Sequence, residues 1–142
     1  MTAVASERLH ATTVAIGDNA ILITGRSGAG KSDLALRLID RGAVLVSDDS
    51  TQLDRKGDRL MASAPLSIKG KLEVFGVGII DLPTREPVPV RLILSIDEPL
   101  TRMPEWTETR TIAGCAIPVI AIDPREPSAP IKAEYALRRV VS

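Results

Sequence analysis

The sequence predicts an α/β fold: a mixed and β-rich sheet, one helix after a glycine-rich loop, and a second helix at the C-terminus. Two observations support this fold class. In residues 20–46 an apolar run leads into a glycine-rich loop, an amphipathic helix and a second apolar run. In the rest of the chain, proline and glycine separate short apolar runs of strand length, and only residues 132–141 return to helical spacing.

Composition indicates a single domain over residues 1–142. Hydrophobic residues make up 44% of the chain, enough for one core that needs no disulfide or metal to hold it. The 18 Lys and Arg residues balance 18 Asp and Glu residues, and the aromatic residues are Phe75, Trp106 and Tyr135. Because the chain has neither a basic surplus nor aromatic stacking platforms, we expect no nucleic-acid partner.

Cysteine usage and hydropathy indicate the cytoplasm. The single cysteine, Cys115, excludes an internal disulfide framework and a cysteine-based zinc site, which fits a reducing compartment. No apolar run reaches the roughly 18 residues of a membrane-spanning helix. Residues 1–8 contain acidic Glu7 and lack the apolar stretch of a targeting signal. We therefore expect a cytoplasmic protein without membrane insertion.

A hairpin opens the chain. Residues 12–16 form a short strand, and a turn at residues 17–19 connects it to a second strand over residues 20–24. The second strand is continuously apolar and β-branched, as expected of a strand that is buried on both faces.

A helix and another strand follow the glycine-rich loop. Apolar residues recur at helical spacing from residue 31 to residue 41, and Gly42 is placed to end the helix. Residues 43–46 then form a second buried strand. Such a β-α-β unit favours a right-handed connection between parallel strands, which need not be adjacent.

The remainder of the chain is expected to be β-rich, after a polar stretch that reaches about residue 59. The expected strands are residues 72–75, 77–81, 88–96 and 117–122, the expected loops are residues 83–89 and 124–130, and the expected terminal helix is residues 132–141.

The glycine-rich loop has the sequence of a phosphate-binding loop (P-loop). It matches the pattern G-x-x-x-x-G-K-[ST] between a strand and a helix, with the residues Gly25, Arg26, Ser27, Gly28, Ala29, Gly30, Lys31 and Ser32. Its backbone N–H groups and the helix N-terminus suit a bound phosphate. Lys31 is expected to bridge the β- and γ-phosphates of ATP, and the Ser32 hydroxyl suits Mg²⁺. The competing interpretation, a structural glycine-rich turn, is disfavoured by the flanking strand and helix.

A nucleotide site also needs a carboxylate near the metal, and two positions at the ends of apolar runs qualify. Asp48 and Asp49 follow the strand connected to the P-loop helix, and ligands of open α/β sheets bind at such strand ends. One of the two can assist the metal while the other takes a proton from an attacking hydroxyl. The alternative for both is a turn or helix-capping role, which is favoured for the other position, Asp81. By themselves, His10 and Glu73 indicate only exposed strand residues.

Four segments carry a combined pattern. They are His10 at the start of a strand, the loop at residues 25–32, Arg41-Gly42 followed by Asp48-Asp49, and the L-E-x-x-G-x-G-I-I-D pattern of residues 72–81. In order and spacing they resemble the catalytic domain of bacterial HPr kinase/phosphorylase, which phosphorylates a serine of the phosphocarrier protein HPr. The resemblance covers residues 9–82 well and is closest to the short alphaproteobacterial form without the family's N-terminal domain. It implies a P-loop kinase core of the HPr kinase / PEP carboxykinase-like type.

The resemblance also implies roles for individual residues. Lys31 would contact the phosphates, and Ser32 and Glu73 would surround Mg²⁺. Asp49 would be the catalytic base, with Asp48 alongside and His10 as a neighbouring contributor.

Later segments match the family more loosely. Arg102 takes the place of a catalytic arginine found after the later strand, residues 124–129 match the loop associated with phosphorolysis, and Asp81 becomes structural. Two positions depart from the family's pattern, because Phe75 stands where Arg is usual and Arg26 stands where Asp is usual.

These observations lead to a main hypothesis and two alternatives. The main hypothesis is an ATP- and Mg²⁺-dependent serine kinase acting on an HPr-type carrier of the phosphotransferase system, with dephosphorylation of the carrier by phosphorolysis as a second activity. The first alternative is a nucleotide-responsive regulatory module that recognises HPr or a sensor kinase. The second, a small-molecule kinase, is disfavoured because no second substrate cassette or arginine-rich lid is present. The resemblance further implies a homo-oligomer, a hexamer.

Overall fold

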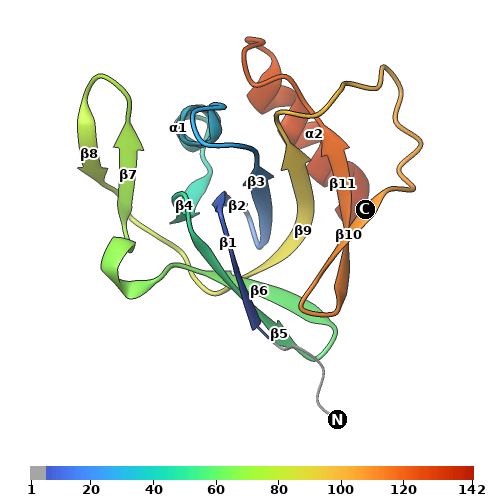
Figure 1. Ribbon diagram of the computed structural model, residues 1–142, viewed down its shortest axis with the longest axis horizontal. Helices are drawn as coiled ribbons and strands as arrows, with labels where there is room; N and C mark the ends of the chain where they lie inside the picture. Colours follow the sequence, from blue (N-terminus) through green and yellow to red (C-terminus); the bar gives the residue numbers. More distant parts are fainter. Residues whose placement is uncertain (1–5) are drawn as a thin grey trace.

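The computed structural model describes residues 6–142, so the start of the segment examined for a targeting signal lies outside the described residues. Within this range the chain forms the following elements: β1 (Ser6–Leu9), β2 (Ala11–Ile16), β3 (Asn19–Thr24), α1 (Lys31–Asp40), β4 (Val44–Ser47), β5 (Thr51–Lys56), β6 (Arg59–Ser63), the 3₁₀ helix η1 (Leu66–Ile68), β7 (Lys71–Val74), β8 (Gly78–Asp81), β9 (Val88–Ser95), β10 (Thr109–Ile112), β11 (Cys115–Ala121) and α2 (Ala129–Val141). The expected mixed, β-rich α/β fold with two helices is confirmed (Figure 1).

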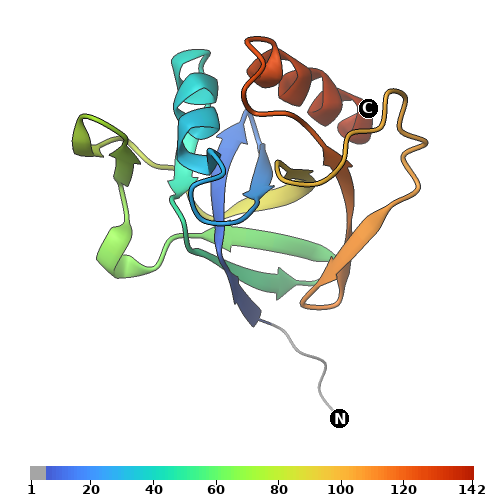
Figure 2. The same ribbon diagram turned by 45° about the horizontal axis from the view of Figure 1, so that its top comes forward.

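One curled, mixed sheet makes up most of the molecule. Its strand order is β1-β5-β6-β9-β3-β2-β4, and β11 pairs with the second half of β9 and carries β10 on its other edge. The strands β3 and β9 are parallel neighbours, as are β9 and β11. Figure 2 shows the two helices on one face of this sheet, while β5, β6 and β10 curl round on the other.

The expected β-α-β unit is present, with a third strand inserted. β2 pairs in antiparallel fashion with both β3 and β4, so β3 and β4 run parallel to each other without touching. The N–H groups of Gly42 and Ala43 bond to the carbonyls of Ile39 and Leu38, which ends α1 at the expected glycine.

Two hydrophobic cores cover the two faces of the sheet. One lies beneath the helices and combines Ile21, Ile23, Leu34, Leu38, Leu92, Leu94, Ala133 and Leu137. The other fills the inside of the curl and combines Leu22, Val46, Leu53, Leu60, Val90, Ile93, Ile112 and Ile117. Successive residues of β3 therefore enter opposite cores, which explains why its sequence is apolar throughout. Neither helix is long and apolar enough to cross a membrane.

The hairpin β7–β8 forms a separate two-stranded sheet that projects beside α1 (Figure 1). Leu72 is fully buried, whereas Phe75, Val77 and Ile79 near the turn are 100%, 74% and 67% exposed. The two strands expected in residues 72–81 are thus present, but they lie outside the main sheet.

The structure corrects three expectations from the sequence. The stretch up to residue 59, described above only as polar, contains β5 and leads into β6. The strands β1 and β10 were not expected either. The inward-facing residues of β5 include Thr51 and Leu53, too few apolar residues to show a strand pattern. The helix α2 begins at Ala129, inside an expected loop, because proline is tolerated in the first helical turn. The strand expected over residues 88–96 is present as β9, which begins at Val88.

Candidate active site

The P-loop connects the C-terminal end of β3 to the N-terminus of α1. Gly30 immediately precedes the helix with φ 111°, a left-handed conformation that favours glycine, and its carbonyl accepts the first helical bond from the N–H of Leu34. The loop therefore presents the N-terminal N–H groups of α1 at the end of the sheet. This is the arrangement in which a helix N-terminus binds a phosphate.

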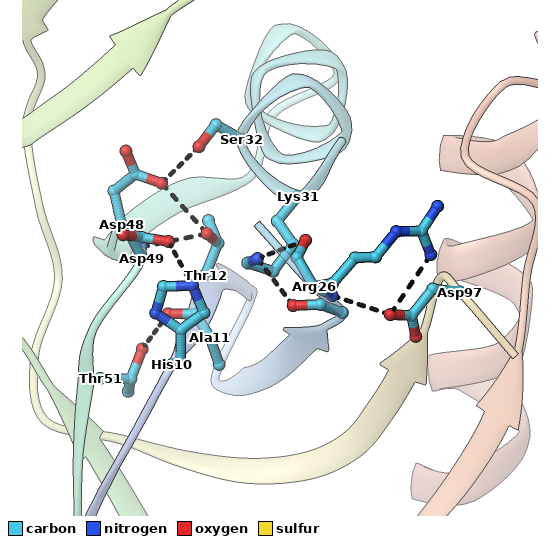
Figure 3. A network of polar contacts seen from close by, with 11 residues as sticks. His10, Ala11, Thr12, Arg26, Lys31, Ser32, Asp48, Asp49, Thr51 and Asp97 are labelled. Atoms are coloured by element: carbon cyan, nitrogen blue, oxygen red, sulfur yellow. Dashed lines mark hydrogen bonds and ion pairs between the residues drawn. The ribbon is translucent and has the colours of Figure 1, made fainter. Parts of the chain in front are cut away.

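Lys31 and Ser32 begin the helix and point in different directions (Figure 3). The Lys31 side chain lies against the loop, and its Nζ donates to the carbonyls of Gly25 (2.8 Å) and Arg26 (3.1 Å). An ammonium has three donors, so one remains for a phosphate oxygen. The Ser32 hydroxyl donates to Asp48 Oδ1 at 2.7 Å, which leaves its oxygen lone pairs available to a cation.

Asp48 connects three elements at the end of β4. Its Oδ1 accepts from the hydroxyls of Ser32 and Thr12, the latter at 3.0 Å, and its Oδ2 accepts from the N–H of Glu73 at 3.0 Å. The residue is only 8% exposed. A buried carboxylate with three donors is held in one position, with its negative charge next to the P-loop serine.

Asp49 turns the opposite way. Its φ of 63° is left-handed, and its N–H donates to the Thr12 hydroxyl at 3.1 Å. The side chain is 61% exposed, with Oδ1 3.3 Å from Nε2 of His10. The adjacent carboxylates therefore diverge, Asp48 toward the P-loop serine and Asp49 toward solvent and the histidine (Figure 3).

A pocket of about 410 Å³ joins these groups to the hairpin. Its lining includes five P-loop residues, both aspartates and residues 73–75 of β7 and its turn; the P-loop residues are Ser27, Gly28, Gly30, Lys31 and Ser32. Glu73, the expected second metal ligand, borders the pocket with an exposed side chain. Across residues 6–142, no three His, Cys, Asp or Glu side chains come together as a metal-binding cluster. The oxygen donors at the pocket suit Mg²⁺, which usually keeps several waters and binds through one or two carboxylates and substrate phosphates.

Asp97 is a site residue that the sequence analysis missed. It follows β9, the strand beside β3, and its Oδ2 accepts from the backbone N–H of Arg26 at 2.8 Å. The Arg26 guanidinium lies 3.7 Å from the same oxygen. An acidic residue directly after an apolar strand was the available signal, because the same signal identified Asp48 and Asp49.

The remaining expected residues lie in three separate places. Residues 124–126 lie beside the P-loop helix, because Arg37 on α1 donates to the carbonyls of Pro124 and Glu126. A hydrogen bond from the side chain of Arg125, two residues further on, lowers the pKa of Asp123. Arg102 lies exposed in the loop between β9 and β10, where it makes no polar side-chain contact with any described residue. Asp81 pairs with Lys71 at 2.9 Å on the hairpin.

Fold and site together define a P-loop nucleotide-binding domain with a carboxylate pair beside the loop. Comparison with known proteins makes this assignment more specific. The family model of the HPr Serine kinase C-terminal domain matches residues 2–85, and the chain belongs to this family.

Individual relatives and one solved structure agree. HPr kinase/phosphorylase of Clostridium tetani is 48% identical over 77 residues, 54% of this chain and 25% of that protein. HPr kinase/phosphorylase of Caldanaerobacter subterraneus subsp. tengcongensis is 38% identical over 104 residues, 72% of this chain and 34% of that protein. The chain thus spans about a quarter to a third of these relatives. The structure of the Hpr(Ser) kinase/phosphatase from Coxiella burnetii superposes with a TM-score of 0.81 at 32% identity, covering 94% of this chain and 89% of that one.

Proposed function

We propose that this chain is an ATP- and Mg²⁺-dependent serine kinase whose acceptor is an HPr-type phosphocarrier protein. The observation that carries the proposal is the divergence of Asp48 and Asp49. One carboxylate is buried against the P-loop serine, and the other stands exposed at the pocket beside His10. A phosphoryl transfer needs both positions, since the metal and the attacking hydroxyl approach the γ-phosphate from different sides.

In the proposed reaction, the P-loop N–H groups and Lys31 hold the phosphates of ATP. Bound Mg²⁺ would neutralise charge on the β- and γ-phosphates, with Ser32 and Glu73 as its protein ligands and Asp48 fixing Ser32. Asp49 accepts the proton of the acceptor serine as the serine oxygen attacks the γ-phosphorus of ATP. The bond from that phosphorus to the β-phosphate oxygen breaks, and ADP leaves. His10 holds the Asp49 carboxylate in position.

The same residues support dephosphorylation by phosphorolysis, in which an oxygen of inorganic phosphate attacks the phosphorus of phosphoserine and pyrophosphate forms. Protonated Asp49 would return its proton to the serine oxygen as the bond from that oxygen to the phosphorus breaks. The position of residues 124–126 against α1 supports a part for residues 124–129 in holding the attacking phosphate. Arg102 stays proposed as the catalytic arginine, on the resemblance alone.

A second candidate function is a nucleotide-responsive module that binds HPr or a sensor kinase without efficient transfer. The fully exposed phenyl ring of Phe75 beside the pocket favours it, because a large exposed apolar side chain often marks a protein contact. Self-association to the hexamer that the resemblance implies would also cover such a surface.

Phosphate transfer from γ-labelled ATP to a purified HPr-type carrier tests the proposal. Label should appear on the carrier with Mg²⁺, and it should disappear when the acceptor serine is replaced by Ala. Lys31→Ala and Asp49→Asn should each lower the rate by at least about 100-fold, with Asp49→Asn retaining ATP binding. The matched control Asp81→Asn removes a carboxylate of the neighbouring hairpin and should retain full transfer. ATP binding without label would favour the regulatory module, and full transfer by Asp49→Asn would exclude Asp49 as the base.

A further inference from the structure

The pocket beside the P-loop has a polar part and an apolar part. Its polar lining comes from the P-loop, the two aspartates and Glu73. Apart from glycines, its apolar lining is Leu36, Val74 and Phe75, which belong to α1, to β7 and to the turn after β7. Because α1 and β7 are in contact, these apolar side chains border the pocket where the helix meets the hairpin.

The helix α1 orders the phosphates of a bound nucleotide. In a P-loop the backbone N–H groups surround the α- and β-phosphates, and the lysine reaches the β- and γ-phosphates. The first helical hydrogen bond of α1 comes from the N–H of Leu34, so the N–H groups of Ser32 and Asp33 have no partner within the helix. They suit the α-phosphate, the one that carries the nucleoside.

The apolar lining lies within reach of that nucleoside. Leu36 is four residues beyond Ser32, which places it on the same face of α1 and about 6 Å further along the axis. Asp33 also lines the pocket between them. A nucleoside that extends from the α-phosphate away from Lys31 therefore meets the end of the pocket that Leu36 shares with the hairpin.

Phe75 is exposed in a defined position at this end. Its side chain is 100% exposed, although the ring lines the pocket. The N–H of Val77 donates to the carbonyl of Val74 at 2.9 Å, which closes the turn that carries the ring. Gly76 has φ 83° within this turn, a conformation that favours glycine. An ordered backbone thus holds a flat apolar group that adds nothing to either core.

The other two aromatic residues are already engaged elsewhere. The guanidinium of Arg138 lies 4.7 Å from the centre of the Tyr135 ring, and that of Arg139 lies 5.2 Å from the centre of the Trp106 ring. Neither ring lines the pocket beside the P-loop. Within residues 6–142, Phe75 is therefore the aromatic side chain available to a ligand of the P-loop.

We propose that Phe75 stacks on the base of the bound nucleotide. Every base has a π-face, and stacking on an aromatic side chain is a general way of binding it. The pocket volume of about 410 Å³ is within the range of small-molecule sites. The family usually has Arg at this position, so the inference concerns this chain in particular. It rests on the proposed function, because it requires ATP at the P-loop.

Calorimetric titration of ATP and of inorganic tripolyphosphate, each with Mg²⁺, tests this proposal. Both ligands carry three linked phosphates, and ATP alone carries a base. Phe75→Ala should weaken ATP binding at least about fivefold, as expected for one lost stacking contact, and should leave tripolyphosphate binding unchanged. Phe75→Tyr retains a ring and should keep the ATP affinity of the parent.

The matched control is Val77→Ala. It removes an exposed apolar side chain from the same turn but outside the pocket lining, so both affinities should stay unchanged. Thermal melting of each variant would establish that it is folded. Lys31→Ala tests the proposed function separately, because it should weaken the binding of both ligands.

Three outcomes would overturn the stacking proposal while leaving the P-loop site intact. The first is unchanged ATP affinity in Phe75→Ala. The second is equal weakening of ATP and tripolyphosphate by that variant, since the ring would then act without the base. The third is unchanged ATP affinity with a raised KM for the carrier, which would assign the ring to the acceptor protein. By contrast, unchanged ATP affinity in Lys31→Ala, or no ATP binding by the parent, would contradict the proposed function as well.

Discussion

Asp49, the proposed catalytic base, has a backbone conformation that suits another residue better. Its φ of 63° costs a residue with a Cβ about 1 kcal/mol, although Asp tolerates this region better than most. Glycine has no such penalty, and Asp49→Gly retains the N–H that bonds to Thr12. We expect Asp49→Gly to match or exceed the parent in unfolding free energy by up to about 0.5 kcal/mol, and Asp49→Ala to lose about 1 kcal/mol.

Urea denaturation of the two variants and the parent measures this difference, and both variants should fail in phosphate transfer. Equal midpoints for the Gly and Ala variants would contradict the left-handed backbone at this position. Higher stability with lost transfer would indicate that the aspartate is retained for its carboxylate rather than for folding.

The sequence predicted the Asp48–Asp49 pair and the P-loop at residue resolution, because both depend on local patterns. It could not predict which carboxylate faces inward. That division depends on Thr12, whose hydroxyl donates to Asp48 and accepts from the N–H of Asp49. Thr12 is 36 residues from Asp48 in sequence, and a threonine in a strand carries no signal of such a contact.

At the scale of elements, the hairpin β7–β8 divides into a buried attachment and an exposed tip. Leu72 is fully buried and β7 lies against α1, whereas the Phe75 side chain is fully exposed. We expect Leu72→Ala to lower the free energy of unfolding by about 2–5 kcal/mol through lost burial and a cavity. Phe75→Ser should change it by less than about 0.5 kcal/mol. Chemical denaturation measures both, and a large loss for Phe75→Ser would show that the tip packs against the body.

Elements with strong local patterns were predictable, and strands with polar sequences were not. β3, β9 and α1 have continuous apolar runs or helical spacing, so their positions follow from the sequence. β1 and β5 instead pair through polar contacts, such as the Ser6 hydroxyl on Asp54 Oδ1 at 2.6 Å, which lowers the pKa of that carboxyl group. A polar strand that forms because it pairs with a neighbouring strand cannot be recognised from its own residues.

The division of the sheet at β9 is a property of the whole molecule. It requires β6 and β11, about fifty residues apart, to share one edge of a single strand. Local patterns do not encode such long-range pairing. The cleft that this division leaves between β6 and β11, lined by Arg55, Arg59, Arg85 and Arg91 and called here the arginine-lined cleft, could therefore not be predicted from the sequence. The same strand, β9, leads from the cleft at Arg91 to Asp97 at the P-loop.

Nucleotide binding should stabilise the folded chain as a unit, because the P-loop directly follows β3, a strand whose side chains enter both cores. Leu22 of β3 enters one core, and Ile21 and Ile23 enter the other. A ligand that binds only the folded state at 100 times its Kd adds about 2.7 kcal/mol to the free energy of unfolding. For a chain of this size, that corresponds to a rise in Tm of about 10 °C.

Thermal unfolding with and without ATP and Mg²⁺ measures the rise. Lys31→Ala should abolish most of it, because the variant loses the ammonium that we propose holds the phosphates. Arg59→Gln should keep it, because the arginine-lined cleft is at the other end of the sheet. An equal rise in the Lys31→Ala variant would show that the nucleotide binds elsewhere. If the Arg59→Gln variant lost the rise in Tm and the Lys31→Ala variant kept it, the nucleotide would bind in the arginine-lined cleft, since the two sites share no lining residue.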